Sequence, residues 1–441
     1  MVRGLNRRQF LSVTGAAGVG LALSACGGSG TPVADTGPAL APGAGYTGPP
    51  VTIQYWHGFT GGDGPAMRQL VDDFNASQDL ITVEQNTVQW AQYYQRVIAA
   101  VHAGKGPDVG AMHLEQLATQ AARQTLNPLD DVVGELGLTA SEYPQQLIEG
   151  GVYNGVRYGV PLDVHCLADY SNSALLQKGD VASAPTTGTQ FQGTLEAIQA
   201  AGAEAPFWMP NRWPAHLMFL SLLWQFGGEP YAADGSKATF ASDAGVQALT
   251  WMRQQVEAGF SPDNVAIDTQ YTAFKNGQVA FTWDGIWQIN DLQTTVPDLK
   301  WGITPIPRIG DQNAVWANSH NLVIFKSRTP DDDRLQAGKV FIRYLTEQSA
   351  AWSKAGMIPA RAAARKEPDF TGSPQAALEP AIPWMRFLPA IPGVPDVQAQ
   401  TLEIAVSDAV LGRQKPADAL KGAASKADQL MQVNLRKFEG E

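Results

Sequence analysis

The sequence is poor in cysteine and has no excess of basic residues, and these shortages exclude several classes of protein. Its 441 residues include only two cysteines, too few for a disulfide framework or a cysteine-based zinc site. Lys and Arg number 31 against 42 Asp and Glu, and a net charge of −11 does not favour nucleic acid or anionic lipid as a partner. Six histidines are spread along the chain without an H-E-x-x-H motif, so we expect no metal site and no cofactor.

A membrane-spanning hydrophobic run is also missing, although a shorter one lies near the N-terminus. Arg7 and Arg8 form a twin-arginine pattern, and the apolar run that follows from residue 11 to 25 is too short to cross a bilayer. The run ends in small residues before Cys26, which resembles a bacterial lipobox. We therefore predict a signal peptide over 1–25, export by the twin-arginine route and lipid anchoring through Cys26 on the outer face of the cytoplasmic membrane.

The segment after Cys26 has the composition of a tether. Residues 27–50 contain seven glycines and five prolines and show no hydrophobic periodicity. Such a segment buries too little apolar surface to fold by itself. We predict a lipidated tether over residues 26–50, followed by the folded body of the chain.

From residue 51 onward, short apolar strands alternate with amphipathic helices, which predicts an α/β fold. Strands are expected at 51–56, at 81–88 and from 107, with an amphipathic helix between each pair. Ligands of such folds lie beyond the carboxyl ends of strands. This rule points to the residues after three predicted strands, namely 57–64, 113–115 and 163–165.

The remainder of the chain continues the same pattern. Residues 213–226 are almost continuously apolar and predict a buried helix, and Ser242 is expected to cap another helix. A strand over 279–284 runs directly into Gly285, Ile286 and Trp287. Further strands are expected at 301–304 and 322–325, and further helices near 331–347, 396–411 and 416–436.

One motif is specific enough to indicate a family. Residues 274–287 read F-K-N-G-Q-V-A-F-T-W-D-G-I-W, and this segment resembles the F-x-x-G-x-x-A-M-x-x-x-G-x-W signature of the extracellular solute-binding proteins of ABC importers. Phe281 stands at the usual methionine position. Supporting fragments occur in the family's order, namely Tyr55–His57, Gly106–Val109, Tyr158–Pro161, Gly227–Gly228 and Gly356–Arg361. The chain is thus similar to the carbohydrate-binding family typified by maltose-binding protein.

The resemblance implies a periplasmic-binding-protein-like fold of two α/β lobes, each a mostly parallel sheet flanked by helices, with a hinge that the chain crosses more than once. Lobe one is expected over 51–161 plus 305–359, and lobe two over 162–304 plus 360–441. The ligand is expected in the cleft between the lobes, which close around it. A monomer that delivers a sugar to the permease subunits of an importer is the implied role, without enzymatic activity.

Trp287 is the strongest candidate for contact with a ligand. A tryptophan after a strand end and Gly285 offers a flat face to the C–H side of a sugar ring. Strand alternation places either Trp283 or Asp284 in the core, and we favour Asp284 for the cleft. Asp163 and Glu115 are at positions where the family places carboxylates that accept hydrogen bonds from sugar hydroxyls.

Five further residues are weaker candidates for the cleft, and each has an ordinary structural alternative. They are His57, His320, Asn321, Trp213 and Arg386.

The ligand itself is open between an oligosaccharide and a cationic amino sugar, because aromatic rings and acids suit both. A glycerophosphodiester is the second possibility within the same importer class, and it requires a basic residue such as Arg386 in the cleft. A surface glycoside hydrolase with paired carboxylates is the alternative from another class.

Overall fold

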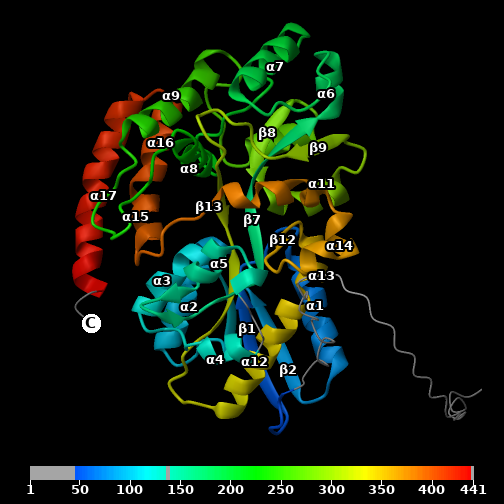
Figure 1. Cartoon of the computed structure of the whole chain (residues 1–441), viewed down its shortest axis with the longest axis vertical. Coiled ribbons are helices and arrows are strands. Elements are labelled where there is room, and N and C mark those ends of the chain that lie inside the picture. Colours follow the sequence, from blue (N-terminus) through cyan, green and yellow to red (C-terminus); the bar gives the residue numbers. More distant parts are fainter. Residues whose placement is uncertain (1–44, 136–139, 439–441) are drawn as a thin grey trace, which may run out of the picture. The chain divides into compact units, whose positions relative to one another are not determined.

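A computed structural model of the chain describes residues 45–135 and 140–438 (Figure 1). The predicted signal peptide, Cys26 and most of the predicted tether lie outside the described residues. Among the described helices, none is both long and apolar enough to cross a membrane.

The first sheet has five strands in the order β2-β1-β3-β11-β6. Its strands are β1 (Val51–His57), β2 (Ile81–Thr87), β3 (Val109–His113), β6 (Val160–Pro161) and β11 (His320–Ile324). β1 pairs in parallel with β2 and β3, whereas β11 pairs antiparallel with β3 and β6. The predicted alternation is confirmed here, because α1 (Gly64–Ser77) connects β1 to β2 and α2 (Trp90–His102) connects β2 to β3.

The second sheet is built around β7 (Asp163–Asn172), which is buried along its whole length. β7 pairs with β8 (Phe281–Gly285), β9 (Trp301–Thr304), β10 (Val315–Asn318) and β12 (Ile358–Pro359), and all four pairings are antiparallel. β13 (Met385–Arg386) pairs in parallel with β10. The expectation of a mostly parallel sheet is therefore wrong for this lobe. The chain enters it along β7 and leaves it along β10, so these two strands run in opposite directions.

The chain passes between the two sheets at short connections. Leu162 alone separates β6 of the first sheet from β7 of the second, and Ser319 alone separates β10 from β11. The sequence predicted the return to lobe one near residue 305, whereas sheet membership places this return at Ser319. The reason is that β10 extends the second sheet before the chain crosses back.

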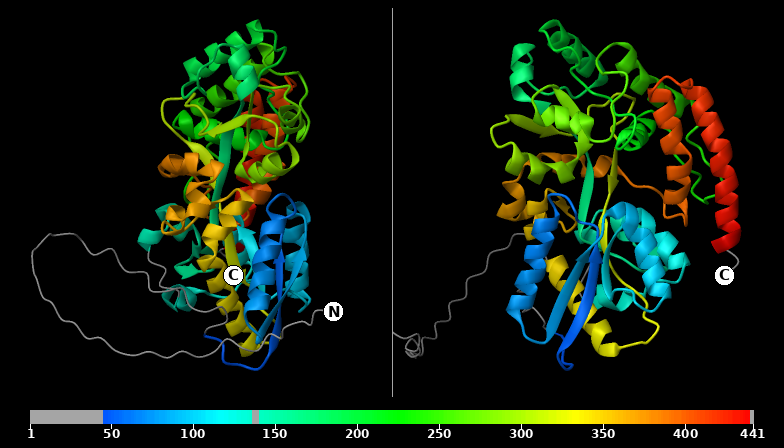
Figure 2. Two further views of the ribbon diagram at one scale, coloured as in Figure 1. Left: turned by 90° about the vertical axis from the view of Figure 1, so that its right-hand side faces the viewer. Right: turned by 180° about the vertical axis from the view of Figure 1, so that it is seen from behind.

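Helices cover both sheets, and two further views show them from other sides (Figure 2). On the first sheet, α12 (Asp332–Glu347) contacts β1 and β11, and α3 (Leu114–Ala122) follows β3. The other helices are α4 (Asp130–Glu135), α5 (Gln145–Gly150), α6 (Ser173–Lys178), α7 (Gly188–Ala200), α8 (Ala215–Gln225), α9 (Asp243–Glu257), α10 (Thr269–Lys275), α11 (Ile289–Thr295), α13 (Ser349–Trp352), α14 (Pro368–Thr371), α15 (Val394–Gln400), α16 (Leu402–Val410) and α17 (Pro416–Phe438). A small hairpin joins β4 (Val152–Tyr153) to β5 (Val156–Arg157).

Several helices form for the reasons the sequence indicated. Ser242 caps α9, since its side chain accepts a hydrogen bond from the backbone N–H of Gly245. Every residue of α8 is buried, as expected for its continuous apolar run. The single helix predicted over 396–411 is two helices, because Thr401 leaves the helical region with φ −134° and separates α15 from α16. α16 packs on α8, α9 and α17.

Candidate ligand-binding site

Three histidines meet where the two sheets join, and the strand register explains why. His113 ends β3 and lies directly opposite His320, the first residue of β11. His165 on β7 lies opposite Asn318, two residues before His320. The ring centroids are 4.3 Å apart for His165 and His320, 4.9 Å for His113 and His320, and 5.6 Å for His113 and His165. The six histidines are spread along the sequence, but three of them come together in the folded chain.

The histidines and the tryptophans around them are called the junction cluster below. It comprises His113, His165, His320, Trp90, Trp213, Trp287 and Trp316. Its members come from both sheets and from the loops and helices beside them.

Asp163 lies at the base of the junction cluster and is fully buried. Its Oδ1 accepts hydrogen bonds from the backbone N–H of His320 at 3.0 Å and from Nδ1 of His165 at 3.2 Å. Its Oδ2 accepts from Nδ1 of His320 at 2.8 Å and from Nε1 of Trp352 at 2.7 Å. Burial would raise the pKa of Asp163, but the histidine charge and these hydrogen bonds outweigh it and hold the pKa well below its usual value. Asp163 therefore braces the junction of the sheets, with four donors around its carboxylate.

The third histidine ring is oriented by a tyrosine. The hydroxyl of Tyr94 lies 2.6 Å from Nδ1 of His113 and accepts the backbone N–H of the same residue at 3.0 Å. Burial lowers the pKa of His113 well below its usual value and the pKa of His165 to about 4. One ring nitrogen from each of His113, His165 and His320 lies within 4.8 Å of the others.

Trp287 forms the aromatic side of the junction cluster. It follows β8 in a short 3-10 turn, Ile286–Gln288, and is half-buried. Its ring centroid lies 5.9 Å from Trp213, 6.0 Å from His165 and 6.4 Å from Trp316. A Cβ on Gly285 would come within 2.1 Å of the Trp287 ring, so only glycine lets this ring fold back over the strand end. The G-x-W spacing of the motif thus has a steric cause.

A second polar group borders the cluster. Glu115 is in the first turn of α3. Burial and the nearby negative charge of Glu403 raise the pKa of Glu115 to about 7. A hydrogen bond from Asn318 acts in the opposite direction but does not outweigh them. Nε2 of His216 lies 3.7 Å from the carboxylate of Glu403. The ring of His216 is also 5.4 Å from that of Trp213, which is 41% exposed. His216 on α8 thus contacts both Trp213 and Glu403 on α16.

Two candidates from the predicted motif lie beneath the surface. Trp283 is completely buried among Phe191, Phe207 and Trp251, which leaves it no surface for a ligand in this structure. Asp284 is also fully buried, and burial raises its pKa to about 7. Its carboxylate accepts hydrogen bonds from the backbone N–H of Gly285 and from the side chains of Gln270 and Gln288, and so holds the turn that leads to Trp287.

His57 and Asn321 make local contacts instead of joining the cluster. Nδ1 of His57 accepts the backbone N–H of Phe59 at 3.3 Å, and its Nε2 lies 3.2 Å from Oε1 of Gln85. Burial lowers the pKa of His57 to about 4. Asn321 is completely buried and donates to Ser319 at the crossing between the sheets.

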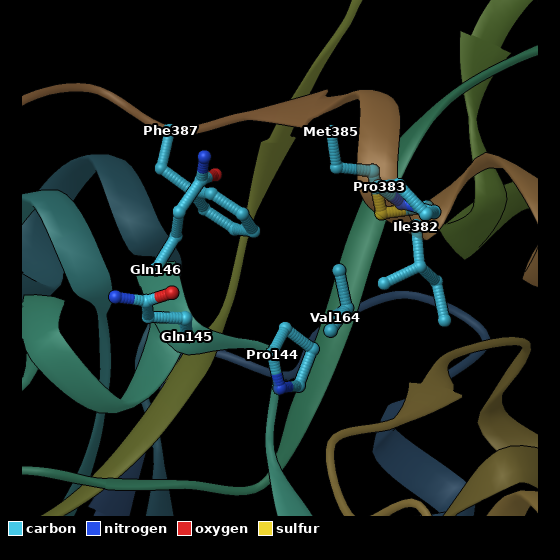
Figure 3. A pocket seen from close by; sticks show the side chains of 8 residues that line it. All are labelled: Pro144, Gln145, Gln146, Val164, Ile382, Pro383, Met385 and Phe387. Carbon is cyan, nitrogen blue, oxygen red and sulfur yellow. The ribbon is translucent and has the colours of Figure 1, made fainter. Parts of the chain in front are cut away.

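Two pockets lie beside β13, the strand that contains Arg386. One pocket of about 380 Å³ is lined by Pro144, Gln145, Gln146, Val164, Ile382, Pro383, Met385 and Phe387 (Figure 3). A neighbouring pocket of about 320 Å³ includes Arg386 with Trp224 and Glu229. Side chains alternate along a strand, so Val164 points away from the face of β7 that carries Asp163 and His165. The first pocket, which Val164 and Met385 line, is therefore on the other side of β7. Arg386 is the register partner of Trp316 on β10, so its side chain lies on the face that carries Trp316.

The sequence missed His113, His165 and Trp316 as individual site residues. His113 and His165 fall within the segments that the strand-end rule marked, and the rule could have selected them. Trp316 could not be found in this way, since it is inside β10 and reaches the cluster only through the pairing of β10 with β7.

The fold agrees with the family comparison. The family model for bacterial extracellular solute-binding proteins matches residues 69–378, and the chain belongs to this family. The family comprises binding proteins and not enzymes, as the sequence predicted.

Three relatives illustrate the similarity. A binding protein of Brucella abortus is 23% identical over 382 residues, covering 83% of this chain and 90% of the relative. The diacetylchitobiose binding protein DasA of Streptomyces coelicolor is 24% identical over 424 residues, which cover 94% of this chain and 96% of DasA. The solved structure of the sugar-binding protein MalE from Xanthomonas citri superimposes with a TM-score of 0.76 at 21% identity, covering 89% of this chain and all of that one. The structural match confirms the two-lobed α/β fold.

Proposed function

We propose that the chain is the substrate-binding subunit of an ABC importer and that it captures a sugar, either an oligosaccharide or an amino sugar, at the junction cluster. The observation that carries this proposal is the half-buried ring of Trp287, which is held over Gly285 with Trp213 and Trp316 close by. The names of two relatives, a diacetylchitobiose binding protein and a sugar-binding protein, support the same ligand class.

The chemistry of the cluster suits a ring with one apolar and one hydroxylated side. Aromatic rings bury the C–H face of a sugar, and polar groups at the edge bind its hydroxyls. Trp287 and Trp213 would supply the aromatic face, while Glu115 and His113 would supply hydrogen-bonding groups. Asp163 would act indirectly, by orienting His165 and His320, since its own oxygens already accept four hydrogen bonds.

Binding would also favour closure of the two lobes. His113 belongs to the first sheet, whereas Trp287 follows a strand of the second sheet. A ligand that touches both sides stabilises the arrangement in which the sides are close together. The closed protein would then deliver its ligand to the permease subunits of the importer.

The location of the protein follows from its N-terminal sequence. We propose export by the twin-arginine route and anchoring through a lipid on Cys26, with a monomeric body outside the cytoplasmic membrane. Replacing Cys26 with Ala should release the exported protein from the membrane fraction. Complete retention of the Cys26→Ala protein in membranes would contradict the lipid anchor.

A glycerophosphodiester is the second candidate ligand, and Arg386 is the residue that would bind its phosphate. A phosphate favours an arginine with free donors. Arg361 pairs with Glu142 at 3.2 Å, whereas Nε of Arg386 is buried and has no hydrogen-bond partner among the described residues. A glycoside hydrolase is not supported, because the family consists of binding proteins.

A thermal-shift screen followed by calorimetry tests the proposed ligand class. The protein is heated with chitooligosaccharides, maltooligosaccharides, glucosamine or glycerophosphocholine, and each hit is titrated against the same protein. A ligand at 100 times its Kd adds about 2.7 kcal/mol of stability, which such a screen resolves. We expect stabilisation by a sugar and none by glycerophosphocholine. Stabilisation by glycerophosphocholine alone would contradict the proposal.

A further inference from the structure

We propose that His113, His165 and His320 form a zinc-binding site at the junction of the two sheets. This site goes beyond the proposed sugar binding, with which it shares His113, and its test uses the metal without a sugar. One ring nitrogen from each histidine lies within 4.8 Å of the other two. Two nitrogens bound to one tetrahedral zinc are about 3.4 Å apart, so the three rings would turn to bring their coordinating nitrogens to this spacing.

The hydrogen bonds around the three rings favour coordination through Nε2. The carboxylate of Asp163 accepts the Nδ1–H groups of His165 and His320. A histidine that donates its Nδ1–H to a carboxylate carries its lone pair on Nε2 and is held at a fixed angle, as in carboxylate–histidine–zinc arrangements.

His113 completes the set in the same sense. When the Tyr94 oxygen accepts the Nδ1–H of His113 as well as its backbone N–H, the lone pair of His113 is on Nε2, as in the other two rings. Among the described residues, no hydrogen bond is made to Nε2 of any of the three rings.

The other histidines of the chain do not form a comparable site. His57 uses both of its ring nitrogens locally, on Phe59 and Gln85. His102 ends α2 on the exposed surface, and His216 faces Glu403. His57 is therefore a suitable control, because it is buried like the proposed ligands but lies outside their cluster.

The ligand set also selects the metal. Cys166 follows His165 on β7 and so points to the opposite face of the strand, which leaves imidazoles as the ligands. Three imidazoles with an open fourth position are characteristic of zinc, and the fourth position would take water or a ligand oxygen. Because His165 belongs to the second sheet and the other two ligands to the first, a bound zinc ion would connect the two sheets.

The test uses the full chain without a histidine tag and with Cys26→Ser, so that the Cys26 thiol does not compete for the metal. After treatment with a chelator, the protein is titrated calorimetrically with Zn²⁺ alone, and Co²⁺ is added separately to report coordination geometry by absorption. We expect one Zn²⁺ per chain, a four-coordinate Co²⁺ spectrum and a higher melting temperature with Zn²⁺. No stoichiometric Zn²⁺ binding, or a six-coordinate Co²⁺ spectrum, would overturn the proposal.

Two variants and one control assign the site. His113→Gln should weaken Zn²⁺ binding by more than about 100-fold, since it removes a ligand, and His57→Gln should leave the affinity unchanged. Tyr94→Phe keeps all three imidazoles and should weaken Zn²⁺ about 10- to 100-fold, as loss of an outer hydrogen-bond partner does. Tyr94→Phe thus remains informative if His113→Gln does not fold. Unchanged Zn²⁺ affinity in either variant would contradict the assignment.

Discussion

Trp283 and Trp287 are four residues apart in the chain, yet their surroundings differ completely. Trp283 is fully buried and stacks on Trp251 with ring centroids 5.4 Å apart. Trp287 follows the end of the same strand, where Gly285 lets its ring turn back towards His165. The comparison teaches that the end of β8, and not the presence of tryptophan, separates a packing residue from a candidate for ligand contact.

The comparison first predicts a large loss of folding stability for Trp283→Ala. Truncating a buried tryptophan leaves a cavity and costs about 3–5 kcal/mol. Urea denaturation should show this loss in the free energy of unfolding, whereas Trp301→Ala, which truncates a half-buried ring on β9, should cost less. A loss below about 1 kcal/mol for Trp283→Ala would contradict its place in the core.

Asp284 lies between the two tryptophans in the chain, and its buried carboxyl should make the folding stability depend on pH. Burial raises its pKa from 3.8 to about 7, so the folded state binds a proton that the unfolded state has released over this range. The contribution of Asp284 to stability is thus present at low pH and is lost as pH rises from about 4 to about 7, on the order of 4 kcal/mol. Asp284→Asn should remove this dependence in denaturation measured at pH 5 and pH 8. An identical pH dependence in the variant would show that Asp284 is solvated.

His57, on the first sheet, should also make the folding stability depend on pH, but its contribution should be lost at low pH and not at high pH. Burial lowers its pKa from 6.5 to about 4, so over this range the unfolded state binds a proton that the folded state does not. Its contribution to stability is complete above about pH 6.5 and is lost as pH falls to about 4, on the order of 3 kcal/mol. His57→Gln should flatten the decline in stability between these values, as measured by urea denaturation at several pH values. A decline as steep as that of the wild type would place His57 in a solvated environment.

The sequence predicted most of the local structure, because local patterns determine it. The strand at 301–304, the cap at Ser242 and the buried helix over 213–226 depend on residues close together in the chain, and each is present in the structure. The directions of the second-sheet strands were not predictable in the same way. They depend on where the chain crosses between the sheets, and Ser319 carries no local signal of that crossing.

The candidate site was predictable only in part. The motif ending at Trp287 and the strand-end rule led to the region where the structure places the junction cluster. The hydrogen bonds of Asp163 join residues that are 157 and 189 positions away in the sequence, at His320 and Trp352. Strand register and helix docking decide such contacts, so the sequence suggested Asp163 as a ligand residue where the structure shows a brace between the sheets.

The central claim, that the junction cluster binds the sugar, is tested most directly by Trp287→Ala. The melting temperature without ligand and the Kd of the sugar identified by the screen are measured on the same protein, with Trp301→Ala as the control. Loss of stacking costs roughly 1–3 kcal/mol, by analogy with bases stacked on aromatic side chains, so we predict about 5- to 150-fold weaker binding at nearly unchanged stability. A large fall in melting temperature with the affinity intact would contradict the account.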